Sequence, residues 1–296
     1  MEQPPFHSGE REAQRRAGFR LDGAPIRDAM PDQHRTFFAG LPFIAVGGMT
    51  ADGSLAAAIL CGPPGFVTSP NPRELRVEAL PDRDDPLLSL LRPGTEMGLL
   101  GLDFATRRRN RVNGRVQTVT TADFSLAVRQ SFGNCPKYIR GRRLASPAPE
   151  DPPPPGDVEP LDRLDDEARH MVERADTAFV TSSSGLTAQA HGGVDISHRG
   201  GPPGFIRIES DTLVVPDFAG NRYFNTIGNF LLHPWAALLF ADFASGDLLH
   251  LAGAVTVAWQ PAAGMNGAQR SWRIEVRSGW RRRSALPLRW ISDPMP

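Results

Sequence analysis

The residue types best suited to chemistry gather in the second half of the chain, around glycines. Ser197, His198, Arg199 and Gly200 stand together. A second polar cluster downstream comprises Asn221, Arg222, Asn225, Thr226 and Asn229. Arginine side chains bind phosphate in a bidentate manner, and glycines let backbone N–H groups approach an anion. The two clusters therefore predict a site for an anionic, hydrogen-bonding ligand.

An internal repeat sharpens this prediction. The segment Gly62–Phe66 recurs as Gly201–Phe205, and the spacing from Gly62 to Gly201 defines a repeat offset. The same offset relates Leu99–Leu100 to Leu238–Leu239, Asp103–Ala105 to Asp242–Ala244, Gly114 to Gly253 and Val116 to Val255. A register held over this length indicates a tandem duplication.

The two copies differ where the polar cluster lies. At the repeat offset, the first copy has Ala58–Cys61, an apolar stretch, in place of Ser197–Gly200. Taken singly, each of these polar residues is better explained as a solvated loop residue. Arg222 has a matching residue in the first copy, Arg83, but the joint absence of the others from that copy favours a ligand site, so we expect one bound ligand per chain.

Short strands must position these residues. Asp52–Gly53 between two apolar runs predicts a β-hairpin. Further strands are expected at 96–102, 112–119, 236–241 and 248–259, and short helices at 31–39, 86–91, 161–175 and 223–232. Residues 6–20 predict an amphipathic helix with Ser8 as its cap. With 29 glycines and 28 prolines in the chain, this pattern predicts a mainly β protein of two antiparallel barrels.

Proline content marks the boundary between the copies. Residues 146–160 contain 7 prolines, which excludes a helix or a central strand and predicts an extended linker. We therefore expect a helical extension at 1–35, a first barrel at 36–145, the linker at 146–160 and a second barrel at 161–296.

Composition excludes several classes of function. Lys+Arg and Asp+Glu both number 33, so no net basic field makes nucleic acid the expected partner. No apolar run is long enough to span a membrane, and no signal-peptide core is evident. Cys61 and Cys135 cannot form a disulfide framework, so we expect a cytoplasmic protein. The histidines lack the spacing of a zinc site, so no metal is expected.

Four stretches resemble the pyridoxamine 5′-phosphate oxidase-related FMN-binding split-barrel family, and within it the members with two barrels in one chain. They are Phe6–Glu10, Asn134–Ile139, Ser197–Phe205 and Asp217–Asn229. The resemblance implies six-stranded Greek-key split barrels that pair within the chain as a pseudo-dimer, with FMN in the groove between them.

The resemblance also implies roles for individual residues. Arg199 and Arg222 are the expected phosphate ligands, with hydrogen bonds from Asn221 and Thr226. The rest of the expected cofactor-binding set is Ser197, His198, Gly200 and Asn229 from the second barrel, and Asn134, Lys137 and Tyr138 from the end of the first. His198 is the one candidate catalytic residue, as a donor to the flavin or a proton-exchanging group.

The implied function is oxidation or reduction of a small molecule, with the flavin transferring hydride or electrons. The alternative is a non-catalytic carrier or sensor that binds flavin or haem. The expected partners are a small-molecule substrate or electron donor, and whole chains could pair further as a homodimer.

Three other features have simpler interpretations. Arg107–Arg111 is interpreted as a solvated charged hairpin in preference to an anion-recognition element. Cys135 is interpreted as a buried structural thiol. Near the end of the second repeat, the family would have a Trp-Asn-Cys-Pro-like stretch, whereas this chain has Ser278–Ser284 with three arginines. A second flavin site is therefore not expected.

Overall fold

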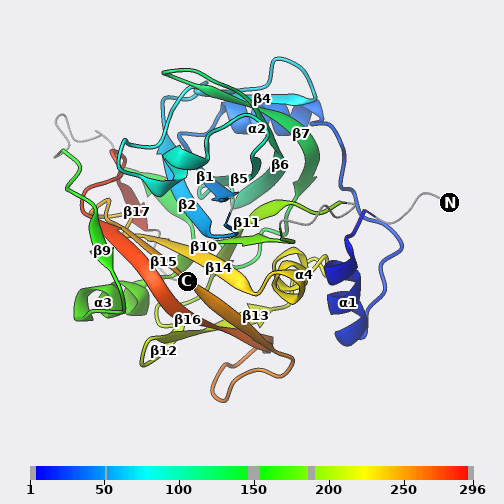
Figure 1. The fold of residues 1–296 in the computed structure, drawn as a ribbon, viewed down its shortest axis with the longest axis vertical. Coiled ribbons are helices and arrows are strands. Elements are labelled where there is room, and N and C mark those ends of the chain that lie inside the picture. The colour runs from blue at the N-terminus through cyan, green and yellow to red at the C-terminus, as the bar shows by residue number, and fades with distance from the viewer. Residues whose placement is uncertain (1–4, 51, 146–153, 186–190, 293–296) are drawn as a thin grey trace.

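The computed structural model describes residues 5–50, 52–145, 154–185 and 191–292, and over these ranges the protein is mainly β (Figure 1). The helices are short: α1 (Ser8–Arg16), α2 (Asp32–Ala39), the 3-10 helix η1 (Pro86–Leu90), α3 (Asp166–Arg174) and α4 (Asn225–Leu232). The first sheet contains β1 (Phe43–Met49), β2 (Leu55–Cys61), β3 (Val67–Thr68), β4 (Glu74–Val77), β5 (Glu96–Asp103), β6 (Arg108–Val119) and β7 (Phe124–Gly133). The second contains β10 (Thr177–Ser183), β11 (Val194–Gly200), β12 (Arg207–Glu209), β13 (Thr212–Phe218), β14 (Trp235–Ala241), β15 (Leu248–Ala258) and β16 (Ala268–Arg282). Three short strands lie outside these paths: β8 (Arg142–Leu144), β9 (Glu159–Leu161), which pairs with β16, and β17 (Trp290–Ser292), which pairs with β8.

The two sheets have the same strand order. The first runs β2-β1-β5-β6-β7-β4-β3 and the second β11-β10-β14-β15-β16-β13-β12, so each strand of one sheet has a counterpart at the same place in the other. Both sheets are antiparallel and curled (Figure 1). The predicted fold class is confirmed. Each path has seven strands where six were expected, because the very short β3 and β12 extend one edge.

The repeat offset found in the sequence relates equivalent positions in these strands. Leu99 faces Val112 across β5 and β6, and Leu238 faces Leu251 across β14 and β15. The predicted Asp52–Gly53 hairpin is confirmed by the pairing of β1 with β2. Gly53 adopts a φ of 88°, a conformation that glycine reaches without strain.

The main apolar side chains pack in three layers: a core in each sheet and a middle layer between the two sheets. Alternation along β1 directs Ile44 and Val46 into the first sheet's own core and Phe43 and Ala45 into a layer between the sheets. Along β10, Phe179 faces the same middle layer, while its neighbours face the core of the second sheet. Burying a side chain such as Phe179 contributes about 1.5–3 kcal/mol. The middle layer therefore joins the two sheets into one body.

Two predicted boundaries differ from the structure. The helix predicted within residues 6–20 is α1, but its cap is His7 and not Ser8, because the Nδ1 atom of His7 accepts from the N–H groups of Gly9 (3.2 Å) and Glu10 (3.4 Å). The helix predicted at 161–175 begins only at Asp166, because residues 159–161 pair with β16 and Asp165 provides the cap. Residues 146–153 of the predicted linker lie outside the described residues.

None of the helices described here is both long and apolar enough to cross a lipid bilayer.

Candidate functional site

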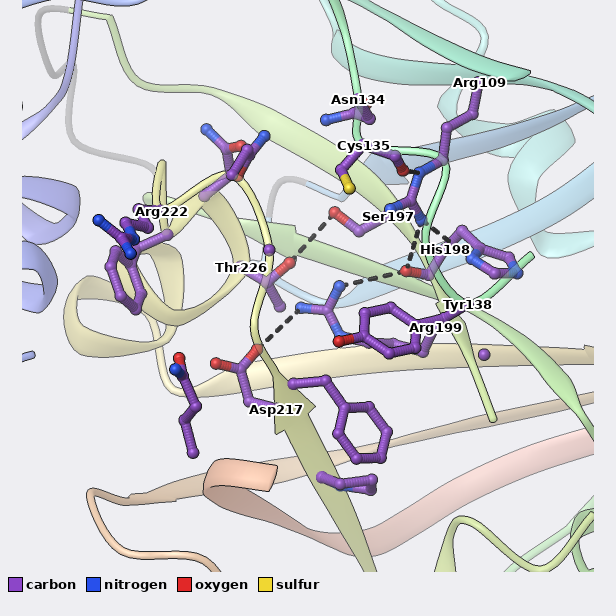
Figure 2. A pocket seen from close by; sticks show the side chains of 18 of the residues that line it. Arg109, Asn134, Cys135, Tyr138, Ser197, His198, Arg199, Asp217, Arg222 and Thr226 are labelled. Carbon is purple, nitrogen blue, oxygen red and sulfur yellow. Dashed lines mark hydrogen bonds and ion pairs between the residues drawn. The ribbon is translucent and has the colours of Figure 1, made fainter. Parts of the chain in front are cut away.

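A groove opens where the two sheets meet, and both sheets line it (Figure 2). The first sheet and the segment after it contribute Leu100, Arg109, Arg111, Asn134, Cys135 and Tyr138. The second contributes the end of β11 (Ser197–Gly200), Phe205, the end of β13 (Pro216–Phe218), the residues Gly220, Asn221, Arg222, Phe224, Asn225 and Thr226, and Gln269 and Arg270 of β16. Segments far apart in the sequence therefore form one site.

All of the expected ligand-binding residues line this groove except two. Asn229 lies fully buried beneath it and donates to Ser182 Oγ and Asp195 Oδ2, at 3.0 Å each. Lys137 is exposed and lies outside the lining, although its neighbours Cys135 and Tyr138 belong to it. The structure thus gives Asn229 a supporting position and Lys137 a peripheral one.

Arg109 and Arg111 were missed as site residues. The predicted solvated hairpin at Arg107–Arg111 is correct for Arg107 and Arg108, which are exposed, but wrong for Arg109, which is half-buried, and for Arg111, which is buried. Arg109 donates to the Cys135 carbonyl oxygen (2.8 Å) and to His198 Nδ1 (2.9 Å). Arg111 is buried, pairs with Asp195 Oδ1 (2.9 Å) and donates to Ser197 Oγ. The first sheet therefore provides two cations to the second sheet's site.

A signal for these arginines was present in the sequence. Arg109, Arg111 and Asn113 are alternate residues of β6, and Val112 between them faces the core of the first sheet. Alternate residues of a strand share one face, so the three polar side chains point the same way. Asn113 joins them by donating to Asp195 Oδ1 (2.7 Å).

Positive charge exceeds negative charge around the groove. Asp217 is shared by Arg270 (2.8 Å) and Arg199 (4.0 Å) (Figure 2). Arg109 and Arg222 have no carboxylate within ion-pair distance among the residues that the structure describes. Burial, with Arg199 and Arg111 close by, lowers the pKa of Arg109 to about 10. An anion in the groove would relieve this repulsion.

His198 is held as a neutral imidazole. Because the Arg109 guanidinium can only donate, Nδ1 of His198 must accept, and the ring proton therefore sits on Nε2. Burial lowers the pKa of His198 well below its ordinary value, and Arg109 and Arg199 add to the effect. His198 can thus donate a hydrogen bond from Nε2, and Arg109 occupies its one lone pair.

The second polar cluster forms the other wall. Thr226 Oγ1 donates to Ser197 Oγ (3.1 Å), which links α4 to β11. Asn221 Oδ1 accepts from the backbone N–H of Tyr223 (3.1 Å), and α4 begins without a side-chain cap. The first N–H groups of a helix attract anions. Their position beside Arg222 adds to the positive potential of the groove.

Tyr138 closes the groove from the side of the first sheet. Its ring stacks on Phe218 with centroids 5.1 Å apart, and its hydroxyl donates to the Ala219 carbonyl oxygen (3.1 Å). This contact crosses from one sheet to the other, as expected for a residue at the end of the first barrel. Cys135 also lines the groove and is half-buried, so it is more accessible than the buried thiol predicted from the sequence.

Several buried polar atoms here have no partner within the described residues. They are Arg111 Nε, Arg199 Nε, His198 Nε2 and Asn134 Oδ1, all on groove residues. Buried polar atoms are normally hydrogen-bonded, so such atoms are groups that a ligand could satisfy. Three donors, an acceptor and surplus cations fit a phosphate-bearing, hydrogen-bonding heterocycle such as FMN. Within the described residues no three or more His, Cys, Asp or Glu side chains gather as metal ligands.

No protein-family model matches the chain, and no curated protein matches it. Several solved structures are similar to parts of it, among them these three. A candidate pyridoxamine 5′-phosphate oxidase from Lactobacillus delbrueckii is 14% identical, with a TM-score of 0.29, and the match covers 36% of this chain and 95% of the oxidase chain. A FAD-binding protein from Mesorhizobium loti is 10% identical, covering 42% and 97%, with a TM-score of 0.27. HupZ from Group A Streptococcus is 13% identical, covering 40% and 98%, with a TM-score of 0.31. Similarity at this level assigns no ligand to this chain.

Proposed function

We propose that the groove between the sheets binds FMN and that the protein is an oxidoreductase acting on a small molecule. The observation that supports this most directly is the group of Arg109, Arg199 and Arg222 around one groove, with Asp217 as the only carboxylate among the described residues that line it. A phosphate dianion would offset that charge through charge-assisted hydrogen bonds, each worth about 1.5–3 kcal/mol.

The residues divide into two groups by chemistry. Arg222 and Arg199, with the N-terminus of α4, would hold the phosphate, and Asn221 and Thr226 would add hydrogen bonds. Arg109 and the Nε2–H group of His198 would supply positive charge and a donor to the ring system. When bound, FMN supplies hydride or electron transfer. The chain's own residues bind and orient it and exclude water, and none has to act as an acid or base.

The contact between Arg109 and His198 argues against haem. Axial ligation by Nε2 requires its lone pair, but donation by Arg109 to Nδ1 places the proton on Nε2. A haem-binding carrier would need this contact to break. A flavin-binding carrier would use the same groove, and turnover separates it from an oxidoreductase.

The visible absorption spectrum of the purified protein, with mass identification of any chromophore released on denaturation, tests the proposal. We expect flavin absorption and about one FMN per chain. Reduction by a nicotinamide donor and reoxidation by an added acceptor would support an oxidoreductase, whereas binding without turnover would support a carrier. A colourless protein that fails to take up added FMN would overturn the proposal.

A further inference from the structure

The segment from Phe6 to Phe19, which includes α1, lies against the back of the loop that presents Arg222. In Figure 1, α1 lies beside α4, and the two helices are in contact. The contacted loop, residues 221–225, lines the groove from the other side. The N-terminal segment does not itself line the groove, so any effect on a ligand must pass through this loop.

The two helices meet backbone to backbone. A Cβ atom added at Gly9 would collide with the carbonyl oxygen of Gly228, and one added at Gly228 would lie 2.6 Å from the Cα of Glu10. Both positions therefore require glycine. This reciprocal contact places α1 at one fixed distance from α4.

Buried polar contacts add direction to the packing. One carboxyl oxygen of Glu10 accepts from the backbone N–H of His7 (2.9 Å), and the other accepts from the side chain of Asn225, the first residue of α4. Gln14 donates to the carbonyl oxygen of Tyr223 (3.4 Å). The N-terminal segment is thus hydrogen-bonded to the loop at the backbone of Tyr223 and at the side chain of Asn225, the last residue of the loop.

Aromatic contacts hold the rest of the loop. The Arg222 guanidinium lies 4.2 Å from the centroid of the Phe19 ring. Phe19 also approaches the ring of Phe224 (6.3 Å), and Phe6 approaches that of Tyr223 (5.8 Å). Each of three consecutive loop side chains therefore contacts an aromatic ring of the N-terminal segment.

The loop needs such support because its backbone is strained. Arg222 and Phe224 have φ values of 65° and 62°, in the left-handed region that residues with a side chain rarely adopt. Their counterparts at the repeat offset, Arg83 and Asp85 of the first copy, are not among the described residues with positive φ. Of these two equivalent loops, only the one that faces the polar groove therefore has this unfavourable conformation.

We propose that residues 6–19 are a positioning element for the ligand site, which holds residues 221–225 in the strained conformation that keeps Arg222 in the lining of the groove. The proposal rests on the proposed function only in that FMN is the probe ligand. Because docking of this element and ligand binding stabilise the same loop conformation, each must strengthen the other by the same factor.

The first test is Gly9→Ala, with Gly23→Ala as the matched control. Alanine favours a helix more than glycine does, so weaker FMN binding by the Gly9→Ala variant would report the collision with Gly228 and not a less stable helix. A Cβ added at Gly23 meets nothing within 4 Å. We expect Gly9→Ala to weaken FMN at least tenfold and to speed hydrogen exchange at residues 221–226, while Gly23→Ala matches the wild type. Reciprocally, FMN should slow exchange in α1 of the wild-type protein.

The second test separates positioning from mere packing. Phe19→Leu removes the ring beneath Arg222 but keeps an apolar side chain, and Phe19→Tyr restores the ring. We expect Phe19→Leu to weaken FMN several-fold more than riboflavin, which lacks the phosphate, and Phe19→Tyr to bind both like the wild type. A merely structural role would lower both affinities together.

The outcomes are distinct for the two proposals. If wild-type protein binds no FMN, the proposed function fails, and faster exchange at 221–226 in Gly9→Ala would still support the positioning element. Unchanged exchange at 221–226 in Gly9→Ala would overturn the positioning element, even if FMN binds the wild type. Equal losses of FMN and riboflavin in Phe19→Leu would also overturn it.

Discussion

The polar groove has a counterpart at the equivalent place on the other side of the molecule, lined by Ile59, Leu60, Leu248 and Trp280 among others. The cavity volume is about 120 Å³ in the polar groove and about 290 Å³ in its counterpart, so the counterpart does not lack space for a ligand. At the repeat offset, Leu60 replaces Arg199, Ile59 replaces His198 and Leu248 replaces Arg109. The repeated fold makes two hollows, and side-chain chemistry decides which one attracts an anion.

The second hollow also differs from the polar groove in its histidine and in its arginine. His250, at the position of Arg111, stacks on Trp280 with parallel rings 5.2 Å apart, and burial lowers its pKa to about 4. Arg282 pairs with Asp82, which stands where the polar groove has Asn221. Arg282 thus has a carboxylate partner, whereas in the polar groove Arg109 and Arg222 lack one within the described residues.

The largest expected difference between the hollows concerns folding. Arg111→Met should lower the free energy of unfolding by about 3 kcal/mol, because it leaves Asp195 buried without its cation. Replacing the counterpart, His250→Leu, removes only a neutral ring and should cost about 1 kcal/mol or less. Urea unfolding followed by tryptophan fluorescence measures both. Equal losses would mean that the Arg111–Asp195 pair adds nothing to stability beyond packing.

The next difference concerns ligand binding. Arg222→Ala should weaken FMN by about tenfold to a hundredfold and leave riboflavin nearly unchanged, because a charge-assisted hydrogen bond to phosphate is worth about 1.5–3 kcal/mol. The matched control is Arg83→Ala, since Arg83 is exposed and occupies the same place in the first repeat. Fluorescence titrations provide the affinities. Comparable weakening of FMN and riboflavin would rule out a phosphate contact at Arg222.

A pH effect on stability is expected where α1 docks against the loop behind the polar groove. Burial and nearby Asp195 raise the pKa of Glu10 to about 8, while Arg111 opposes the shift, and burial lowers the pKa of His7 to about 4. Folded protein therefore retains the Glu10 proton up to about pH 8, whereas unfolded protein releases it near its ordinary pKa of 4.5. His7 has the opposite effect on stability. Between about pH 4 and pH 6.5 the imidazole of His7 is protonated in the unfolded protein but not in the folded protein, so stability rises with pH over this range.

Between about pH 6.5 and 8, only Glu10 of the two residues Glu10 and His7 differs in protonation between the folded and the unfolded protein. Its contribution to the free energy of unfolding should therefore fall with rising pH, by at most about 1.4 kcal/mol per pH unit. Glu10→Gln, an uncharged mimic of the protonated acid, should flatten this part of the profile. The measurement is thermal unfolding of both proteins across that range. Parallel profiles would show that Glu10 is already ionised in the folded protein.

The smallest effect is expected at the second hollow, the counterpart of the polar groove. Asp82→Ala removes the partner of Arg282 from a half-exposed ion pair, so the free energy of unfolding should fall by about 1 kcal/mol or less. FMN affinity should not change, because Asp82 lies outside the polar groove. The same titrations and unfolding curves suffice. A change in FMN affinity would show that the two hollows are coupled or that both bind ligand.

Much of the architecture could be predicted because its causes are local. Strand alternation, the Asp52–Gly53 turn and the constant offset between copies depend on neighbouring residues and on chain length alone. The contrast between Ala58–Cys61 and Ser197–Gly200 located one wall of the groove, and Asn221–Thr226 located the other. Helix starts were less predictable, because His7 and the pairing of β9 with β16 compete with ordinary capping patterns.

The sequence by itself determined two antiparallel units, their equivalence position by position, and the polar residues that only one of them has. Only the tertiary structure decided that Arg109 and Arg111 belong to the site, because each meets its partners across the boundary between the sheets. It likewise placed Asn229 beneath the groove and Phe19 under Arg222. A strand pattern specifies which face a side chain occupies, but the partner it meets there depends on how separately folded segments pack together.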